Sequence, residues 1–331
     1  MSLKGLSRKR RYHALSDFLR SRFGTRVQKV TLDAGFTCPN RDGTRGRGGC
    51  IYCNALGSGT GAFRQGLSIR EQMLQGMARL ARRYKAQKFI AYFQAFSNTY
   101  APVEVLRERY IQALVDERVV GLAVGTRPDC VDEEVVELLS EYVAQGYMVW
   151  LEMGLQSAHD ETLRRINRGH TWADFVRALE LAKEKGLLVC THVIFGLPGE
   201  GPEEMLQTIE QLAPLPLDGI KFHELYVVRG TKMEALLQQG RYRPLLQTEY
   251  VDLVCEALAL LPWSVVIQRL TGDPRREELV APDWASAKGE TLRMIEETLL
   301  ARDLWQGKYL GAPDPLVADL VEPAQAQRAI T

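Results

Sequence analysis

Three cysteines in one short segment are the residues of this sequence whose type and spacing point most directly to chemistry. They stand in CPNRDGTRGRGGCIYC as Cys38, Cys50 and Cys53, three of the six cysteines in the chain. Cys50 and Cys53 form a C-x-x-C pair, a spacing that lets two thiolates face one ion or cluster, and Cys38 joins them across eleven residues. Four glycines in between give the backbone the freedom to wrap a bound group. We therefore interpret the three thiols as metal ligands.

The number of candidate ligands favours an iron–sulfur cluster over zinc. A structural zinc site usually recruits four nitrogen or sulfur ligands, but no Cys or His lies between residues 54 and 129. Three thiolates suit a cluster with one iron left open. The motif alone leaves a redox C-x-x-C pair, a three-cysteine zinc site and buried structural thiols as alternatives. The other cysteines, Cys130, Cys190 and Cys255, stand alone and are expected to be core residues.

Composition and charge place the chain among ordinary globular proteins. It has 331 residues, 46% of them hydrophobic and 25% charged. No apolar run reaches the ~18 residues that a membrane span needs. The N-terminus lacks the apolar region of a secretory signal, so we expect a cytoplasmic protein with reduced thiols and no membrane contact.

The charge is spread unevenly along the chain. Residues 1–30 hold nine lysines and arginines against one aspartate, a formal +8, so the remainder carries −7. Such asymmetry suggests a polyanionic partner such as RNA, although a basic start that only aids solubility is the alternative.

Beyond the cysteine loop, strand-like and helix-like segments alternate about six times. Strands are expected at 27–32, 88–94, 119–125, 147–153, 187–195 and 219–228. Helices are expected at 68–86, 102–116, 132–145, 171–185, 201–212 and 231–239. Apolar strands separated by amphipathic helices indicate an α/β protein with a parallel sheet covered by helices. A partial barrel and an open doubly wound sheet both fit this pattern.

The pattern changes after residue 244, where a helix (248–261), a short strand (264–270) and a long helix (284–304) are expected. We predict four parts: a basic segment (1–26), the strand–helix region (27–243), a small C-terminal α/β extension (244–311) and a flexible tail (312–331).

Function in parallel α/β folds collects at the carboxyl ends of the strands. After the cysteine loop these ends read QAFSNTY (94–100), GTRPD (125–129), EMGLQS (152–157) with NRGH (167–170) behind it, HVIFGLPGE (192–200) and HELY (223–226). Every one of them is polar, glycine-bearing or both.

Together these segments resemble the radical S-adenosylmethionine (SAM) superfamily. GFTCPNRDG, FQAFSNTY, GLQSAHDETLRRINRGH and FGLPGE look like its YhcC/YtqA-like branch, akin to the Elp3-like enzymes, over about residues 12–310. Two features depart from the wider superfamily. The first cysteine spacing is C-x11-C in place of C-x3-C, as in the branch, and FQAFSNTY replaces the usual Gly-Gly-Glu stretch.

The resemblance implies a partial (β/α)6 TIM-type barrel with a [4Fe–4S] cluster on Cys38, Cys50 and Cys53. It implies that SAM binds the open iron through its amino and carboxylate groups. The reduced cluster would then cleave SAM to a 5′-deoxyadenosyl radical, which takes a hydrogen atom from the substrate. An electron donor such as flavodoxin or ferredoxin would reduce the cluster.

Side chains at the strand ends can be matched to the groups of SAM under this resemblance. Arg168 suits the carboxylate through a charge-assisted pair, and Gln156 and Glu152 offer acceptors for the ribose hydroxyls. Ser97 and Asn98 could receive the ammonium group.

The adenine is expected to meet apolar and backbone surfaces. Tyr52 offers an aromatic face, and the backbone at Gly196 and Leu197 can approach the adenine edge closely. The complete set of predicted SAM-binding residues is Tyr52, Gln94, Ser97, Asn98, Thr126, Glu152, Gln156, Arg168, His192, Gly196 and Leu197.

Three residues on the fifth and sixth strands are candidates for catalysis on the substrate side. His192 lies inside the fifth strand, close to the expected ribose, while His223 and Tyr226 stand at the end of the sixth. Hydrogen-bonded core histidines and ordinary strand polarity are the alternative interpretations.

The resemblance also implies a substrate. The branch looks like enzymes of wobble-uridine modification that convert a carboxymethylaminomethyl group of tRNA to aminomethyl. The basic N-terminus fits, since Lys and Arg make phosphate contacts. Two other classes stay open: a radical SAM enzyme acting on a small molecule or protein, and a non-catalytic iron–sulfur or zinc protein that binds RNA.

Overall fold

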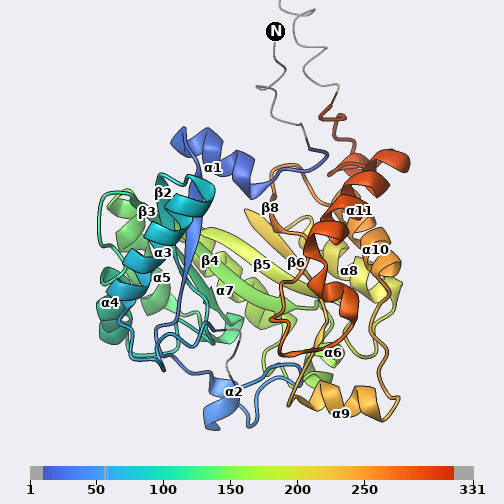
Figure 1. Ribbon diagram of the computed structural model, residues 1–331, viewed down its shortest axis with the longest axis horizontal. Coiled ribbons are helices and arrows are strands. Elements are labelled where there is room, and N and C mark those ends of the chain that lie inside the picture. The colour runs from blue at the N-terminus through green and yellow to red at the C-terminus, as the bar shows by residue number, and fades with distance from the viewer. Residues whose placement is uncertain (1–9, 56, 58, 317–331) are drawn as a thin grey trace, which may run out of the picture.

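The computed structural model describes residues 10–55, 57 and 59–316. In these residues seven parallel strands form one sheet, and Figure 1 shows it curled, with helices outside. The strand order is β1 (Val27–Leu32), β2 (Lys88–Phe93), β3 (Val119–Thr126), β4 (Met148–Gln156), β5 (Leu188–Phe195), β6 (Gly219–Glu224) and β8 (Val266–Arg269). The expected α/β partial barrel is confirmed. Strands β1 to β6 begin within one residue of the predicted positions, and β8 begins two residues after its predicted start.

Helices follow the strands as the amphipathic patterns predict. Ser68 and Thr171 form capping boxes with Glu71 and Asp174, so they begin α3 and α7. The helices of the barrel are α2 (Pro39–Asp42), α3 (Ile69–Tyr84), α4 (Val103–Ile111), α5 (Glu133–Ala144), α6 (Asp160–Arg165), α7 (Trp172–Glu184), α8 (Pro202–Leu212) and α9 (Lys232–Gln238). A 3-10 turn at Pro128–Cys130 follows β3.

Alternate residues of each strand face two different environments. On β4, Leu151 and Met153 pack in the large core between the sheet and the outer helices. Met148 and Trp150 instead pack in a smaller cluster with residues of neighbouring strands and of α1 (Leu15–Phe23). Because the side chains alternate, Glu152 shares the inner face of the sheet with Trp150.

The helix α1 closes one end of the barrel and was not predicted. The segment before it pairs with β8, where Ile267 N–H donates to His13 O (2.8 Å), and Phe18 meets the Trp150 ring edge-on at 5.9 Å. Figure 1 shows α1 at the opposite end of the barrel from α2 and α9. The end with the cysteine loop is therefore the one left for ligands.

The C-terminal region adds to the barrel. The strand predicted at 264–270 is β8, which pairs with β6, while α10 (Gln247–Leu260) and α11 (Lys288–Ala301) pack together. The strand predicted at 219–228 is divided into β6 and β7 (Val227–Val228), and β7 pairs antiparallel with β9 (Leu279–Ala281). The helix predicted at 284–304 consists of a 3-10 turn (Asp283–Ser286) and α11, and another turn covers Lys308–Leu310.

Parts of two predicted segments lie outside the described residues: 1–9 of the basic segment and 317–331 of the tail. The domain boundary at residue 244 stays a prediction, although the strand beyond it joins the barrel sheet. Among the described residues, no helix is both long and apolar enough to cross a membrane.

Candidate active site

The cysteine loop follows β1 and is fixed by two distant parts of the chain. Ile51 N–H donates to Ile166 O at the end of α6 (3.1 Å), and Ile51 O accepts from Met233 N–H in α9 (3.1 Å). Two of its thiols are buried, the third is half-buried, and all are free of disulfides. The loop thus presents reduced thiols from a backbone held by remote elements.

Two arginines lie against these thiols. Nη1 of Arg168 donates to Cys50 Sγ (3.6 Å), and Nη2 of Arg41 donates to Cys53 Sγ (3.1 Å). Burial would raise the pKa of Cys50, but Arg168 and then Arg127 outweigh burial and lower it. Burial and the neighbouring Cys50 raise the pKa of Cys53. Arg168 and Arg127 therefore favour the thiolate form of Cys50.

The three thiols of the loop fit the thiolate ligands of a [4Fe–4S] cluster. In the described part of the chain, no three His, Cys, Asp or Glu side chains converge closely enough to hold one metal ion. The cysteines of a cubane each bind a different iron, so their sulfurs stand apart. Arg127 Nη1 is buried without a hydrogen-bond partner among the described residues, and such a donor suits an anionic group. That the ligands are Cys38, Cys50 and Cys53 stays a prediction.

Arg168 and Gln156 meet at the end of β4, as the strand-end argument predicts. Arg168 donates from Nη2 and Nε to Gly154 O (2.6 and 3.2 Å). A β-carbon on Gly154 would lie 2.7 Å from Arg168 Nη2 and 2.6 Å from Gln156 Nε2, so a side chain there would displace both groups. Gln156 has a left-handed φ of 82° after a register shift in β4, which turns its side chain back over Gly154.

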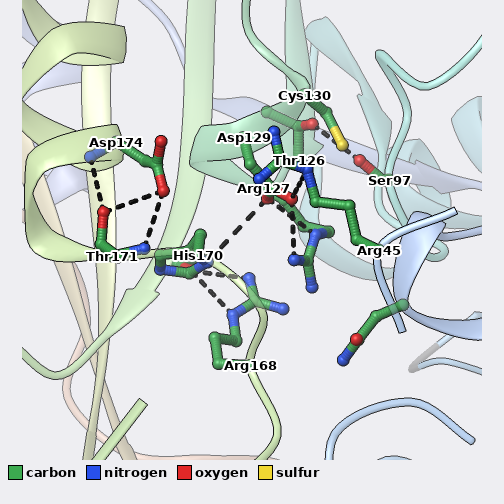
Figure 2. Close-up of polar contacts among 12 residues, drawn as sticks. Arg45, Ser97, Thr126, Arg127, Asp129, Cys130, Arg168, His170, Thr171 and Asp174 are labelled. Atoms are coloured by element: carbon green, nitrogen blue, oxygen red, sulfur yellow. Dashed lines mark hydrogen bonds and ion pairs between the residues drawn. The ribbon is translucent and has the colours of Figure 1, made fainter. Parts of the chain in front are cut away.

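A buried salt bridge stands behind Arg168. Arg127, only 2% exposed, donates from Nε and Nη2 to the two oxygens of Asp129 (2.9 Å each). His170 Nδ1 lies 4.0 Å from Asp129, and Figure 2 shows Arg168, His170 and Arg127 arranged around this carboxylate. Burial, followed by Arg168 and Arg127, lowers the pKa of His170 well below its usual range. A neutral histidine thus separates two cations beside the cysteine loop.

The hydroxyl and amide groups predicted to receive the SAM ammonium bond mainly to protein. Ser97 Oγ and Thr126 Oγ1 are 3.0 Å apart, and Thr126 also contacts Thr99 Oγ1 (2.6 Å). Asn98 donates to Phe93 O (3.2 Å) and Gly125 O (2.7 Å). The predicted residues Ser97, Asn98 and Thr126 are thus brought together, and their hydrogen bonds link the ends of β2 and β3. Half-buried Gln94 follows β2, and its backbone N–H donates to Leu32 O at the end of β1 (3.3 Å).

The residues predicted near adenine take two different positions. Leu197 is 1% exposed and packs with Ile51 and other apolar residues under the cysteine loop, where Tyr52 packs as well. The backbone of Gly196 instead faces residues 242–245: its O accepts from Tyr242 Oη (2.9 Å). Leu197 and Tyr52 therefore form one apolar wall, and Gly196 supports it from behind.

Glu152 is the centre of a buried ion cluster inside the half-barrel. One carboxylate oxygen accepts from Lys29 Nζ, and the other accepts from Lys221 Nζ and from His192 Nε2 (3.2 Å). Lys221 also donates to the Tyr92 hydroxyl (3.1 Å). We call these five residues the interior cluster. Because both oxygens are occupied, the structure does not present Glu152 as the open ribose acceptor expected from the sequence.

The electrostatics of this cluster follow from burial and from its two ammonium groups. Burial alone would raise the pKa of Glu152, but Lys221 and Lys29 lower it well below its usual range. Burial lowers the pKa of Lys221 to about 8, with Lys29 acting in the same direction against Glu152. The carboxylate is thus ionised at neutral pH.

The two candidate catalytic histidines lie side by side, with ring centres 6.0 Å apart. Burial and Lys221 lower the pKa of His192 to about 4, and burial with Arg269 lowers that of His223 well below its usual range. Both rings are therefore neutral at pH 7. Tyr226, two residues beyond β6, has its pKa raised to about 12 by burial and Glu224, so its hydroxyl keeps its proton. The catalytic roles of these residues stay predictions.

Sequence reasoning assigned no role to several residues of the site. Arg127 and Asp129 stand in the strand end GTRPD. Their opposite charges, two residues apart at a strand end, could have indicated a salt bridge in the site. Lys221 is the only Lys or Arg in the strand segment GIKFHELYVV and stands between two apolar residues, which implies a buried partner. Arg41 and Lys29 lie among other basic residues, where nothing distinguishes them in sequence.

The half-barrel with a thiol loop at its ligand-facing end defines a class of cofactor enzymes, and family comparison agrees. The sequence matches the Radical SAM superfamily model over residues 40–212 and the Radical_SAM C-terminal domain over residues 217–301. The chain belongs to the radical SAM superfamily. Members of this family use a [4Fe–4S] cluster and SAM, so the chain is a radical SAM enzyme.

Individual relatives place the chain within the family. It is 45% identical over 295 residues to YhcC of Escherichia coli, covering 89% of this chain and 94% of that protein, which confirms the expected branch. It is 29% identical over 167 residues to the tRNA uridine(34) acetyltransferase of Methanocaldococcus jannaschii, covering 49% of this chain and 30% of that protein. The solved Elp3 of Methanocaldococcus infernus shares the fold, with a TM-score of 0.64 at 18% identity, covering 85% of this chain and 64% of that one.

Proposed function

We propose that this radical SAM enzyme acts on tRNA and converts the carboxymethylaminomethyl side chain of a wobble uridine to the aminomethyl form. The observation that carries the proposal is the similarity of about half of the chain to an enzyme that acts on uridine 34 of tRNA, the wobble position. The matched stretch is comparable in length to the part of the chain that the family model covers. A nucleoside of tRNA is therefore the substrate class that the relatives favour.

A basic surface supports an RNA partner. A groove of about 630 Å³ runs between the start of the described chain, α1 and α11. Its basic lining residues are Arg10, Arg11, Arg20 and Arg26, of which Arg10 pairs with Asp17 and Arg11 pairs with Asp303 and Asp314. Tyr84 at the end of α3 also lines it, and the neighbouring Arg82 and Arg83 are exposed. Phosphates would contact this face, which lies at the far end of the barrel, as suits a substrate much larger than the nucleoside.

Different residues at the end of the barrel with the cysteine loop would bind different groups of the cofactor. When bound, the cluster supplies the electron that cleaves SAM to a 5′-deoxyadenosyl radical. Arg168, fixed by its two bonds to Gly154 O, would orient the SAM carboxylate beside Gln156. Tyr52 and Leu197 would exclude water from the adenine side. The proposal includes a cytoplasmic setting and an external one-electron donor such as flavodoxin or ferredoxin.

The test compares the modified nucleosides of tRNA from a wild-type and a deletion strain by mass spectrometry. The proposal expects the carboxymethylaminomethyl nucleoside to accumulate and the aminomethyl form to disappear in the deletion strain. Complementation with the intact gene restores the pattern, and complementation with C50A does not. Unchanged uridine modification, while the purified enzyme still forms 5′-deoxyadenosine from SAM, would leave a radical SAM enzyme acting on a small molecule or protein.

A further inference from the structure

A register shift at the edge of the sheet aims an arginine into the half-barrel. Strand β8 pairs with β6 at Gly219–Val266 and Ile220–Ile267, but the next pair is Lys221–Arg269. Gln268 is thus an extra residue on β8, and such a bulge lets two consecutive side chains turn to one face. Gln268 accepts from Lys29 (2.5 Å), and Arg269 Nη1 lies 3.3 Å from His223 Nε2. Both therefore adjoin the interior cluster.

The charges around Arg269 do not balance. The cations are Lys29, Lys221 and Arg269, and the nearby carboxylates are Glu152 and Glu224. Glu152 is used by the two lysines, and Glu224 accepts from Thr271 Oγ1 (2.9 Å) and Gly272 N–H (2.6 Å). Within the described residues Arg269 forms no ion pair, and its side chain is only half-buried. At least one positive charge is left over for a ligand.

Hydrogen-bond donors also outnumber acceptors inside the half-barrel. Trp150 Nε1 and Gln268 Nε2 are buried without a partner among the described residues. Each of the three cations carries several N–H groups. The acceptors around them are fewer: the Glu152 oxygens, one Gln268 oxygen, the Tyr92 hydroxyl, the histidine rings and Glu224 Oε1, which is buried without a partner among the described residues. Buried donors usually find partners, so this surplus points to a bound group that only accepts. A carboxylate is such a group and pairs with a guanidinium in bidentate fashion.

These donors lie close to the residues predicted to bind the cofactor. Gly154, which holds Arg168, pairs in the sheet with His192 of the interior cluster. Glu152 lies two residues before Gly154 on the same inner face, about 7 Å along the strand. A group bound between them lies beside the end of the barrel where Arg168 contacts the cysteine loop.

We propose that the half-barrel binds a carboxylate of the substrate between the interior cluster and Gly154, with Arg269 as its bidentate partner and Lys221 as the second cation. This inference rests on the proposed function in one respect, that the substrate must reach the cofactor from inside the barrel. It assigns the substrate a class, a carboxylate-bearing molecule, and it makes Arg269 a residue that selects it. The acid side chain of the proposed nucleoside belongs to that class.

The first test asks whether a carboxylate reaches Arg269, whatever the true substrate is. The anaerobically reconstituted holoenzyme is treated with phenylglyoxal, which modifies arginines, and the modified residues are mapped by mass spectrometry. Acetate at up to about 0.1 M should slow modification of Arg269 severalfold, and neutral acetamide should not. Arg293, on the surface in a pair with Glu297, should react equally in both. Equal reaction of Arg269 with and without acetate overturns the proposal.

The second test uses the proposed nucleoside. With SAM present and no reductant, calorimetry should show the holoenzyme binding 5-carboxymethylaminomethyluridine at least about tenfold tighter than its methyl ester. R269Q should lose this preference, R269K should keep part of it, and the surface control R293Q should keep all of it. Equal binding of acid and ester, or a preference that survives in R269Q, overturns the carboxylate site. If acetate protects Arg269 but neither nucleoside binds, the carboxylate site stands and the tRNA function fails.

Discussion

Lys29 on β1 donates a hydrogen bond to Gln268 on β8 (2.5 Å), across the seam between the two edge strands of the half-barrel. In the described sheet these strands share no backbone ladder. The same ammonium group contacts Glu152 on β4, so one side chain ties both edges to the middle of the sheet. The barrel is thus closed at this level by buried, hydrogen-bonded side chains of the interior cluster and Gln268, which makes these contacts part of the structure.

Replacing Lys29 should therefore destabilise the fold. K29M leaves the fully buried Glu152 with one ammonium partner fewer, and we expect a loss of about 2–4 kcal/mol in the free energy of unfolding. The matched control is K185M, whose partner Glu137 is largely exposed, and it should cost less than about 1 kcal/mol. Urea unfolding measures both. Equal effects of K29M and K185M would show that the interior cluster contributes nothing to stability.

The six cysteines should separate into two groups. C38A, C50A and C53A should each lose most of the iron and sulfide incorporated on anaerobic reconstitution, because each removes one thiolate ligand. C130A, C190A and C255A should load normally, since these thiols are buried and burial raises the pKa of each to about 12. Iron content, sulfide content and the visible spectrum of each variant measure how much cluster it holds. Zinc in place of iron, or full iron loading of the triple variant C38A/C50A/C53A, would contradict the cluster.

Arg168 should control SAM binding. R168Q removes the guanidinium that lies between Gly154 and Cys50, and we expect SAM to bind about 10- to 100-fold more weakly. R164Q, which changes an exposed arginine of α6 four residues before Arg168, is the control and should bind SAM normally. Equilibrium binding to the unreduced holoenzyme gives the affinities. If R168Q binds SAM as tightly as R164Q does, Arg168 serves only the cysteine loop.

The neutral state of His192 predicts how stability depends on pH. Its pKa is lowered to about 4 in the folded protein, so between pH 6.5 and 4 the unfolded chain binds a proton that the folded protein does not. The free energy of unfolding should therefore fall as the pH decreases, by on the order of 2 kcal/mol for this group between pH 7 and pH 5. H192Q removes that contribution, so its pH dependence should be shallower by this amount. Parallel curves for the two proteins would mean that the fold does not lower the pKa of His192.

Most of the barrel could be predicted from sequence because its strands are continuous apolar runs. KFIAYF and VVGLAVGT are short apolar runs whose length and composition predict β-strands. Both strands are buried on their two faces in the structure. The helix α1 was missed because its sequence, LSDFLRSRF, shows a weak apolar pattern within a run of arginines. Leu19 and Phe18 form its buried side, and they become apolar contacts only where Trp150 faces them across the barrel.

The sequence by itself determined the thiol loop, the order of the strands along the chain and the polar strand ends, since these depend on residue type and on spacing over a few residues. Only the tertiary structure decided that Glu152 faces two lysines instead of open space, and that Arg269 turns inward. Lys29, Glu152, Lys221 and Arg269 come from four strands that span 241 residues of sequence. The curl of the sheet and one bulge bring them together. Their contacts are favoured because a buried charge costs free energy unless it is paired.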